Sequence, residues 1–296
     1  MRRLWSLLAV VTVFSLLCTG TAEAPASTAP PAPPAAQREA GQDAGTETGT
    51  GVDTAPEQGR RPARGKASAT ANALYRTGRL PRLRCAPGEI LPGSAASYRG
   101  FMSRVTACLN RSWGRQFAKA RLPFTKPRLR FVTGQVSSPC GKWPTGAGGY
   151  YCSANRTIYI GITKRVLREG FELGSAQFMA HEYAHHVQTL SGIGPDYYFP
   201  RHAWAGRAEA LALSRRFEVQ ADCMGSAFLG SVAGTLPVRD TDWRGMIEWT
   251  TRYGDEAWPA NDHGKGSTQA YWMGRGFEAC APGACNTWTA SKARVA

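Results

Sequence analysis

The chain has 296 residues and a formal net charge of +15, and its length suits one generous domain or two small ones. The positive charge would attract an anionic partner, such as an acidic cell-surface polymer. The basic residues are spread along the chain, however, and this pattern favours an ordinary solvated basic surface. Because no nucleic-acid-binding motif accompanies them, we expect no specific nucleic-acid partner.

The first 24 residues resemble an export signal. Arg2 and Arg3 precede an apolar run over residues 4–17, which is short for a membrane span. We therefore expect a cleaved signal peptide over residues 1–24 and a secreted, extracytoplasmic protein. The alternative is that the segment is not cleaved and anchors the protein in the membrane with its domain facing outside. Only in that case would the membrane be a partner of the protein.

A low-complexity segment follows the expected signal. Residues 25–72 are rich in Pro and Ala and then in Gly and Thr, and large apolar side chains return only at Leu74 and Tyr75. Such a composition buries too little surface to offset the entropy lost on ordering. We expect a disordered linker over residues 25–72 and one folded domain over residues 73–296.

The domain shows two kinds of periodicity. Short alternating apolar runs predict strands over 128–132 and 157–162, with a glycine-rich loop at 146–149 between them. Helical spacing of apolar residues predicts helices over 97–118, 175–190, 207–229, 242–253 and 267–277. Since strands and helices do not alternate, we expect an α+β fold that is rich in helix and has a small β-sheet.

The cysteines are expected to be structural. Seven of the eight remain after removal of the signal, and exported chains keep disulfides. Proximity along the chain predicts the pairs Cys85–Cys108, Cys140–Cys152 and Cys280–Cys285, with Cys223 unpaired. No Cys-x-x-Cys pair is present, so the spacings do not indicate a zinc ribbon.

The predicted helix over 175–190 carries His181-Glu182-Tyr183-Ala184-His185. Residues four apart on a helix lie nearly above one another, so both imidazoles can reach one zinc ion. A catalytic zinc site needs a third protein ligand and keeps one position for water. Glu182 would take a proton from that water as a general base. His186 lies about 100° round the helix from His185, so it cannot share the metal.

The third ligand is expected on the predicted helix over 207–229. Glu218 and Asp222 lie four residues apart on one face, where Glu218 would bind the metal. Asp222 would accept a hydrogen bond from the far nitrogen of a ligating histidine. Ordinary ion pairs of these two acids with Arg215 or Arg216 are the alternative. Glu209 is a weaker candidate ligand, because it lies half a turn round the helix.

Residues 130–278 resemble the bacterial neutral zinc metallopeptidase family in four segments. These are Cys140 to Cys152 with the strand Thr157-Ile158-Tyr159-Ile160, the zinc helix from Ala180 to Gln188, the run Glu218 to Cys223, and Asp262-His263-Gly264 with Trp272. Ala184 stands where Gly is usual, and Ser267-Thr268-Gln269 replaces the usual Glu-Gln-Arg. The resemblance implies a zincin-like, gluzincin-type peptidase with Zn²⁺ on His181, His185 and Glu218 and with Glu182 as the base.

His263 is a further candidate for a catalytic role. It lies in a polar turn, where Gly264 would let the backbone approach the cleft and Asp262 could orient the ring. Zinc peptidases commonly add a donor that stabilises the oxyanion of the transition state. The family resemblance favours that role over the alternative, a histidine that caps a surface loop.

The expected function is therefore an extracytoplasmic zinc peptidase with a peptide or protein substrate. Two alternatives remain open from the sequence. One is a zinc hydrolase or amidase that acts on cell-wall material, and the other is a non-catalytic surface-binding module with a structural zinc. A structural site would close its fourth position with another protein ligand.

Overall fold

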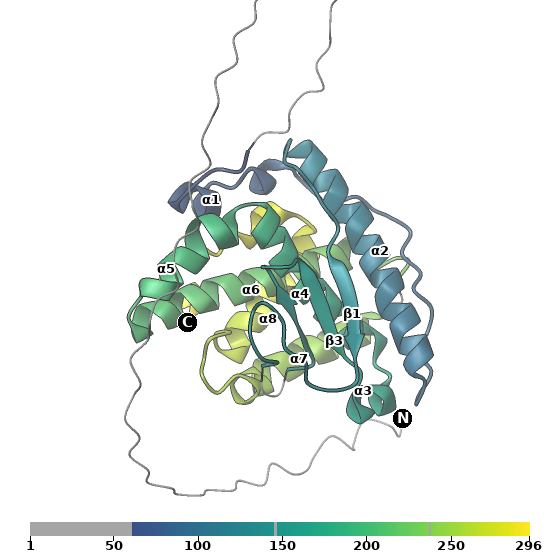
Figure 1. Cartoon of the computed structure of the whole chain (residues 1–296). Coiled ribbons are helices and arrows are strands. Elements are labelled where there is room, and N and C mark those ends of the chain that lie inside the picture. Colours follow the sequence, from purple (N-terminus) through teal and green to yellow (C-terminus); the bar gives the residue numbers. More distant parts are fainter. Residues whose placement is uncertain (1–60, 145–146, 237) are drawn as a thin grey trace, which may run out of the picture. The chain divides into compact units, whose positions relative to one another are not determined.

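The computed structural model describes residues 61–144, 147–236 and 238–296 (Figure 1). The expected signal peptide, most of the expected linker and Gly146 of the glycine-rich loop lie outside these residues. The α-helices are α1 (Lys66–Thr70), α2 (Ala95–Lys119), α3 (Lys164–Glu169), α4 (Glu172–Leu190), α5 (Phe199–Trp204), α6 (Arg207–Val232), α7 (Asp240–Ala257) and α8 (Gly266–Ala279). The strands are β1 (Arg128–Val132), β2 (Gly149–Cys152) and β3 (Thr157–Gly161). Single helical turns lie at η1 (Ala73–Arg76), η2 (Gly194–Tyr198), η3 (Pro282–Cys285) and η4 (Lys292–Val295).

The expected α+β fold, rich in helix and with a small sheet, is confirmed. Figure 1 shows α2 along one side of the domain and α6 and α8 beyond α4, and the packing contacts follow the same order. Among the residues described, no helix is long and apolar enough to span a bilayer.

The sheet has the strand order β1-β3-β2. β3 pairs with β1 in parallel, with Arg128 opposite Thr157, and with β2 in antiparallel orientation, with Tyr151 opposite Ile158. All five residues of β3 are buried, as its central place and its run of Thr, Ile and Tyr require. β2 is therefore an edge strand, and it contacts α4.

α2 is amphipathic and begins at a capped turn. The side chain of Ser94 accepts a hydrogen bond from the backbone N–H of Ser97. Its apolar face, which includes Phe101, Val105, Leu109, Trp113 and Phe117, is wholly buried. The helix packs against α4, where the Tyr183 hydroxyl donates to Oδ1 of Asn110 at 2.8 Å.

α6 crosses α4 closely at Gly225. A Cβ atom at this position would lie 3.0 Å from the backbone nitrogen of His181 and 3.1 Å from the carbonyl carbon of Ala180. A larger residue would force the two helices apart. Gly225 thus sets the distance between the helix that carries the two histidines and the helix that carries Glu218.

The folded region starts earlier than expected. The expected linker ended at residue 72, but α1 lies inside it, and Ala69 is fully buried. The side-chain amide of Asn72 donates to the carbonyls of Ser68 at 2.6 Å and Ser191 at 2.9 Å. Small residues make these contacts, and for that reason a search for large apolar side chains overlooked them.

Two predicted disulfides are confirmed and the third is wrong. Cys85–Cys108 and Cys140–Cys152 are bonded as expected, whereas Cys223 pairs with Cys285 and Cys280 is a buried free thiol. Cys280 ends α8 in the left-handed conformation, and the turn beyond it folds back onto α6. This reversal brings Cys285, not Cys280, next to Cys223.

Candidate metal centre

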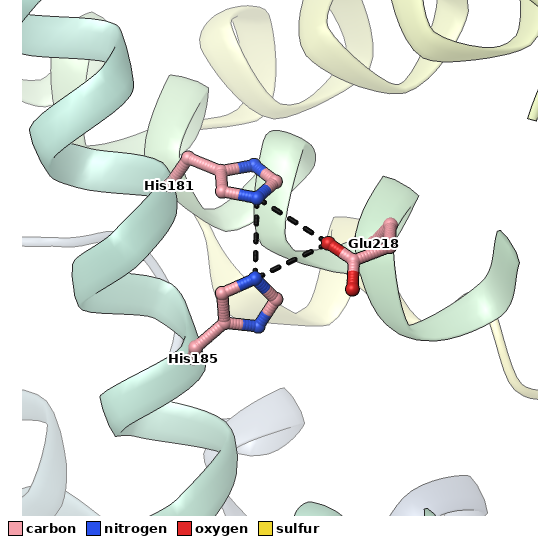
Figure 2. Close-up of side chains that lie close together, drawn as sticks. All are labelled: His181, His185 and Glu218. Carbon is pink, nitrogen blue, oxygen red and sulfur yellow. Dashed lines mark hydrogen bonds and ion pairs between the residues drawn. The ribbon is translucent and has the colours of Figure 1, made fainter. Parts of the chain in front are cut away.

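Two imidazoles from α4 and one carboxylate from α6 converge on a common point (Figure 2). Nε2 of His181 lies 3.2 Å from Nε2 of His185. Oε2 of Glu218 lies 3.4 Å from Nε2 of His181 and 3.2 Å from Nε2 of His185. The His181 and Glu218 side chains are 14% and 16% exposed, so solvent reaches the cluster.

These separations fit zinc. Zinc holds imidazole nitrogens and carboxylate oxygens at about 2.0–2.1 Å, so neighbouring ligands of a tetrahedral site lie about 3.3 Å apart. The three observed distances, 3.2 to 3.4 Å, equal the edges of such a tetrahedron. Within the part of the chain described, no other group of three His, Cys, Asp or Glu side chains gathers its ligand atoms in this way.

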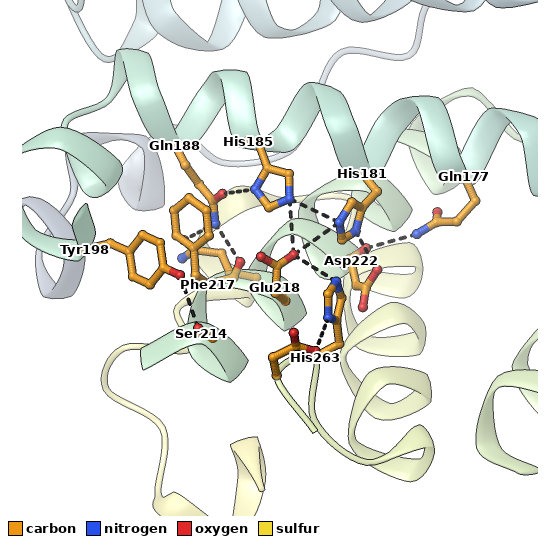
Figure 3. A network of polar contacts seen from close by, with 12 residues as sticks. Gln177, His181, His185, Gln188, Tyr198, Ser214, Phe217, Glu218, Asp222 and His263 are labelled. Carbon is orange, nitrogen blue, oxygen red and sulfur yellow. Dashed lines mark hydrogen bonds and ion pairs between the residues drawn. The ribbon is translucent and has the colours of Figure 1, made fainter. Parts of the chain in front are cut away.

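Each ligating histidine is held through its other nitrogen (Figure 3). Nδ1 of His181 lies 2.8 Å from Oδ1 of Asp222, as expected. Nδ1 of His185 lies 2.9 Å from Oε1 of Gln188, a contact that the sequence analysis did not consider. Because both acceptors need a proton on Nδ1, each ring presents an unprotonated Nε2 to the metal position when it is neutral.

Gln188 belongs to a longer buried network. Its amide donates to the carbonyl of Phe217 at 2.8 Å and to Oε1 of Gln220 at 3.1 Å. The amide of Gln220 donates in turn to the Tyr75 hydroxyl at 2.8 Å and to the Cys285 carbonyl at 2.9 Å. The sequence held one signal for this network, since Gln188 follows His185 by three residues on the same helix face.

Glu182 lies beside the cluster on α4 and is only 7% exposed. Burial raises the pKa of this carboxyl above its usual value, although His181 and His185 oppose the shift. The backbone of Tyr151, in the edge strand β2, also lowers this pKa. Glu182 is thus close to both histidines and to the edge strand β2.

The electrostatics of the cluster favour a bound cation. Burial alone would raise the pKa of Glu218, but His185 and His263 outweigh it and hold this pKa well below the usual value. Burial alone would lower the pKa of His181, yet Asp222 outweighs it and raises this pKa well above 6.5. Glu218 is thus ionised and ready to bind a cation, and a divalent ion that binds the imidazoles would displace their Nε2 protons.

The structure brings His263 to the same place (Figure 3). Nε2 of His263 lies 3.4 Å from Oε2 of Glu218, and its Nδ1 lies 2.8 Å from Oδ1 of Asp262. The indole of Trp258 stacks flat on the imidazole, with ring centroids 3.6 Å apart. The ligand atoms of His181, His185 and Glu218 all lie within 4.8 Å of one another, and His263 does not belong to this group. His263 therefore lies beside the three candidate ligands. No local sequence pattern predicts this role of Trp258.

The two remaining histidines lie away from the ligands. His186 is fully buried, with Nε2 2.7 Å from the Thr125 carbonyl and Nδ1 3.0 Å from the Tyr151 hydroxyl. Burial lowers the pKa of His186 to about 4, as suits a neutral ring that joins α4 to β2. His202 lies on α5 and contacts the ring of Tyr198.

The alternative partners of the two acids on α6 are not used. Arg215 and Arg216 donate to backbone carbonyls, of Asn261 and of Thr287 and Ala290 respectively. Glu209 forms an exposed ion pair with Arg201 at 2.5 Å. It lines a surface cavity of about 470 Å³ with residues of η2 and α5, and neither His181 nor His185 lines this cavity.

Comparison with known proteins agrees with this geometry. Residues 91–288 match the family model described as "Putative neutral zinc metallopeptidase". The chain belongs to this family. Its matched region contains the two histidines, Glu182, Glu218 and His263, together with both halves of the Cys223–Cys285 bond.

The relatives in this family carry no assigned activity in their names. The chain is 30% identical over 203 residues to the uncharacterized protein YpfJ of Escherichia coli K12. This match covers 64% of the chain and 70% of the relative. It is 26% identical over 204 residues to the uncharacterized protein Rv2575 of Mycobacterium tuberculosis H37Rv, covering 58% and 66% respectively. No solved structure matches the chain.

Proposed function

We propose that the chain is an extracytoplasmic zinc-dependent peptidase. The observation that carries this proposal is the convergence of His181, His185 and Glu218 at separations of 3.2 to 3.4 Å, next to the buried Glu182. Three protein ligands with a solvent-accessible side are the arrangement of a catalytic zinc site, whereas a structural site has four protein ligands.

In this mechanism the bound zinc ion would lower the pKa of water and polarise the scissile carbonyl. Glu182 accepts the proton of the attacking water and passes it to the leaving amine. Its burial supports this role, because a carboxylate with a raised pKa is a better proton carrier near neutral pH.

His263 stabilises the negative charge that develops on the carbonyl oxygen. Oδ1 of Asp262 accepts a hydrogen bond from Nδ1–H of His263, and this bond aims Nε2 of the ring towards the ligand cluster. The flat stack of Trp258 leaves the imidazole little freedom to rotate. The alternative role, a cap on a surface loop, would not require a side chain that is only 15% exposed and next to Glu218.

A peptide is the substrate that the sheet best accommodates. β2 is an edge strand that contacts α4, and the backbone of its residue Tyr151 is near enough to Glu182 to lower the pKa of this carboxyl. An extended peptide that adds to this edge would pass beside the general base. A cell-wall amide could be cut by the same groups, but it would not use the backbone of an edge strand.

The location outside the cytoplasm is supported by the three disulfides of the described domain. Disulfides persist in oxidising compartments and are rare in reducing ones. The positively charged N-terminus and the apolar run after it are the second support.

The test is the substitution Glu182→Gln. The amide keeps the size of the carboxylate but cannot accept a proton, so cleavage of a peptide library should fall by about 10²–10⁴-fold while bound zinc is retained. Metal content by mass spectrometry and digestion with and without a chelator provide the two readouts.

Glu209→Gln is the matched control, because it removes one carboxylate from a surface ion pair. It should leave cleavage and zinc content unchanged. Wild-type-level cleavage by the Glu182→Gln protein would refute the assignment of the base. Release of peptidoglycan fragments with no peptide cleavage by the wild type would favour the cell-wall alternative instead.

A further inference from the structure

Charge is strongly segregated between the two halves of the described domain. Residues 61–168 contain 21 lysines and arginines and a single acidic residue, Glu89. Residues 169–296 contain 11 basic and 14 acidic residues. The basic residues are therefore concentrated in the first half of the described domain.

All 21 basic side chains in the first half are exposed. The densest array lies on the outer face of α2 and on the chain segment beside it. We call it the α2 basic strip, which consists of Arg79, Arg82, Arg84, Arg99, Arg104, Arg111, Arg115 and Lys119. α2 itself contains no acidic residue, and from Arg99 to Lys119 it extends about 30 Å.

The segment that precedes α2 is fixed along the helix. The Cys85–Cys108 disulfide joins the two, and the guanidinium of Arg111 donates to the Arg84 carbonyl at 3.2 Å. Nζ of Lys119 donates to the Arg79 carbonyl at 3.2 Å. These bonds use backbone carbonyls as acceptors, so they hold two rows of cations side by side without neutralising any charge.

The strip keeps its full charge. Among the residues described, the side chains of Arg79, Arg82, Arg99 and Arg115 have no hydrogen-bond or ion-pair partner. Arg111, Arg115 and Lys119 follow one another at four-residue intervals. Such neighbours on a helix face lie about 6 Å apart, which is less than the Debye length of about 8 Å at physiological salt. Their potentials therefore add along the helix, and keeping like charges this close has an electrostatic cost that an anionic partner would relieve.

The strip lies on the side of α4 away from the candidate metal centre. α2 packs on α4 through Asn110 and Tyr183, whereas His181 and His185 face α6. Tyr183 is two residues from each histidine, which places it about 160° round the helix. A partner bound along the strip would leave the metal centre accessible.

We propose that the α2 basic strip binds a linear phosphate-bearing polymer and so holds the protein on an anionic matrix. Seven of its eight side chains are arginines, whose planar guanidinium pairs with phosphate oxygens through two parallel bonds. Arg104, Arg111, Arg115 and Lys119 lie within about 80° of one another around α2 and form a row, as a flexible chain of anions requires. Arg99 lies about 140° round the helix from Arg104, at the N-terminal end of α2.

Two other anionic partners fit less well. The exposed positions between the cations of α2 are small residues such as Ser103, Ala107 and Ala118, which offer nothing to insert into a lipid bilayer. The strip itself contains no aromatic side chain on which bases could stack, as single-stranded nucleic acid would need. Membrane and nucleic acid are therefore tested as competing outcomes.

The experiment titrates the full chain with long-chain inorganic polyphosphate at a series of salt concentrations. The protein is treated with chelator first, because polyphosphate binds metal ions, and binding then reports on the strip independently of zinc and of cleavage. Arg79→Gln, Arg82→Gln, Arg99→Gln and Arg115→Gln are combined in one variant. The matched control combines Arg207→Gln, Arg244→Gln, Arg252→Gln and Lys292→Gln, which removes the same charge from exposed positions of the other half.

We expect the strip variant to bind polyphosphate about 10- to 100-fold more weakly than the wild type. The slope of the logarithm of the binding constant against the logarithm of the salt concentration should become shallower by about three units, since each of the four lost phosphate contacts contributes about 0.7. The control variant should change by less than about threefold. Equal weakening of both variants, or no binding by the wild type, would overturn the proposal. Tighter binding to phosphatidylglycerol vesicles or to DNA than to polyphosphate would replace the polymer with that partner.

Discussion

The candidate metal centre and the α2 basic strip treat charge in opposite ways. At the metal centre, His181, His185, Glu218 and His263 are each less than one-fifth exposed, and each has a polar partner. On the strip, eight cations are exposed and four of them have no partner at all among the residues described. At the metal centre the charged groups are paired with one another, whereas the positive potential of the α2 basic strip extends into solvent.

The difference shows how burial decides what a charge can do. A buried charge without a partner is costly, so each group at the metal centre constrains its neighbours and few substitutions are tolerated. An exposed charge is screened by water and salt, so it can be lost individually and acts mainly through the sum with its neighbours. Substitutions should therefore have large single effects in the first region and only collective effects in the second.

The largest effect is expected from Glu218→Ala. This change removes one of three ligands and leaves two neutral imidazoles, which do not complete a zinc site. Zinc should be lost on dialysis, as measured by metal analysis. Glu209→Ala, on the same helix, is the control and should retain zinc. Loss of metal from the Glu209→Ala protein would show that Glu209, and not Glu218, is the third ligand.

His263→Ala should have the next largest effect. Turnover is expected to fall by about 10²-fold, because one donor to the oxyanion is lost, while zinc affinity stays nearly the same. Steady-state kinetics should show the loss in kcat more than in KM. His202→Ala removes a histidine from α5 as a control. Loss of zinc from the His263→Ala protein would instead make His263 a fourth ligand and favour a structural metal.

Asp222→Ala and Gln188→Ala should each weaken zinc binding by about 10–100-fold, because each removes the acceptor that fixes the ring of one ligand. Competition with a fluorescent zinc chelator measures the affinity. Asp222→Asn should restore part of it, since the amide oxygen still accepts from Nδ1 of His181. If the Gln188→Ala protein binds zinc as tightly as the wild type, the hydrogen bonds of Gln188 stabilise the fold but do not position His185.

The smallest effect is expected from the four-residue strip variant when stability is measured instead of binding. Exposed substitutions change the free energy of unfolding by about 0.5 kcal/mol or less each, and the removal of like charges offsets part of that cost. Urea unfolding should give a midpoint close to that of the wild type. A marked loss of stability would mean that these arginines are structural.

The sequence predicted those parts of the molecule that depend on one helix at a time. His181 and His185 share a face because they are four residues apart, and the same spacing made Glu218 and Asp222 visible as a pair. The strands over 128–132 and 157–161 and the five longer helices follow from local periodicity in the same way.

What the sequence could not predict depends on contacts between distant segments. Cys223 and Cys285 are separated by 62 residues, and only the reversal of the chain after α8 brings them together. The roles of Gln188 and Trp258 arise because α6 and the turn after α7 pack beside α4. The clustering of the arginines, too, becomes visible only when the segment 79–84 is placed against α2.

The network around Gln220 has a consequence for the order in which the site can assemble. His185 is held by Gln188, which bonds to Gln220, and Gln220 is held in turn by the Cys285 carbonyl and by the indole of Trp288. During synthesis the two histidines emerge about a hundred residues before Trp288. A chain that ends before Trp288 keeps Gln188 but lacks the C-terminal groups that hold Gln220 in place. The chain is thus expected to acquire a complete zinc site only after its C-terminal segment has packed on α6, and the Cys223–Cys285 disulfide then fixes that segment in place.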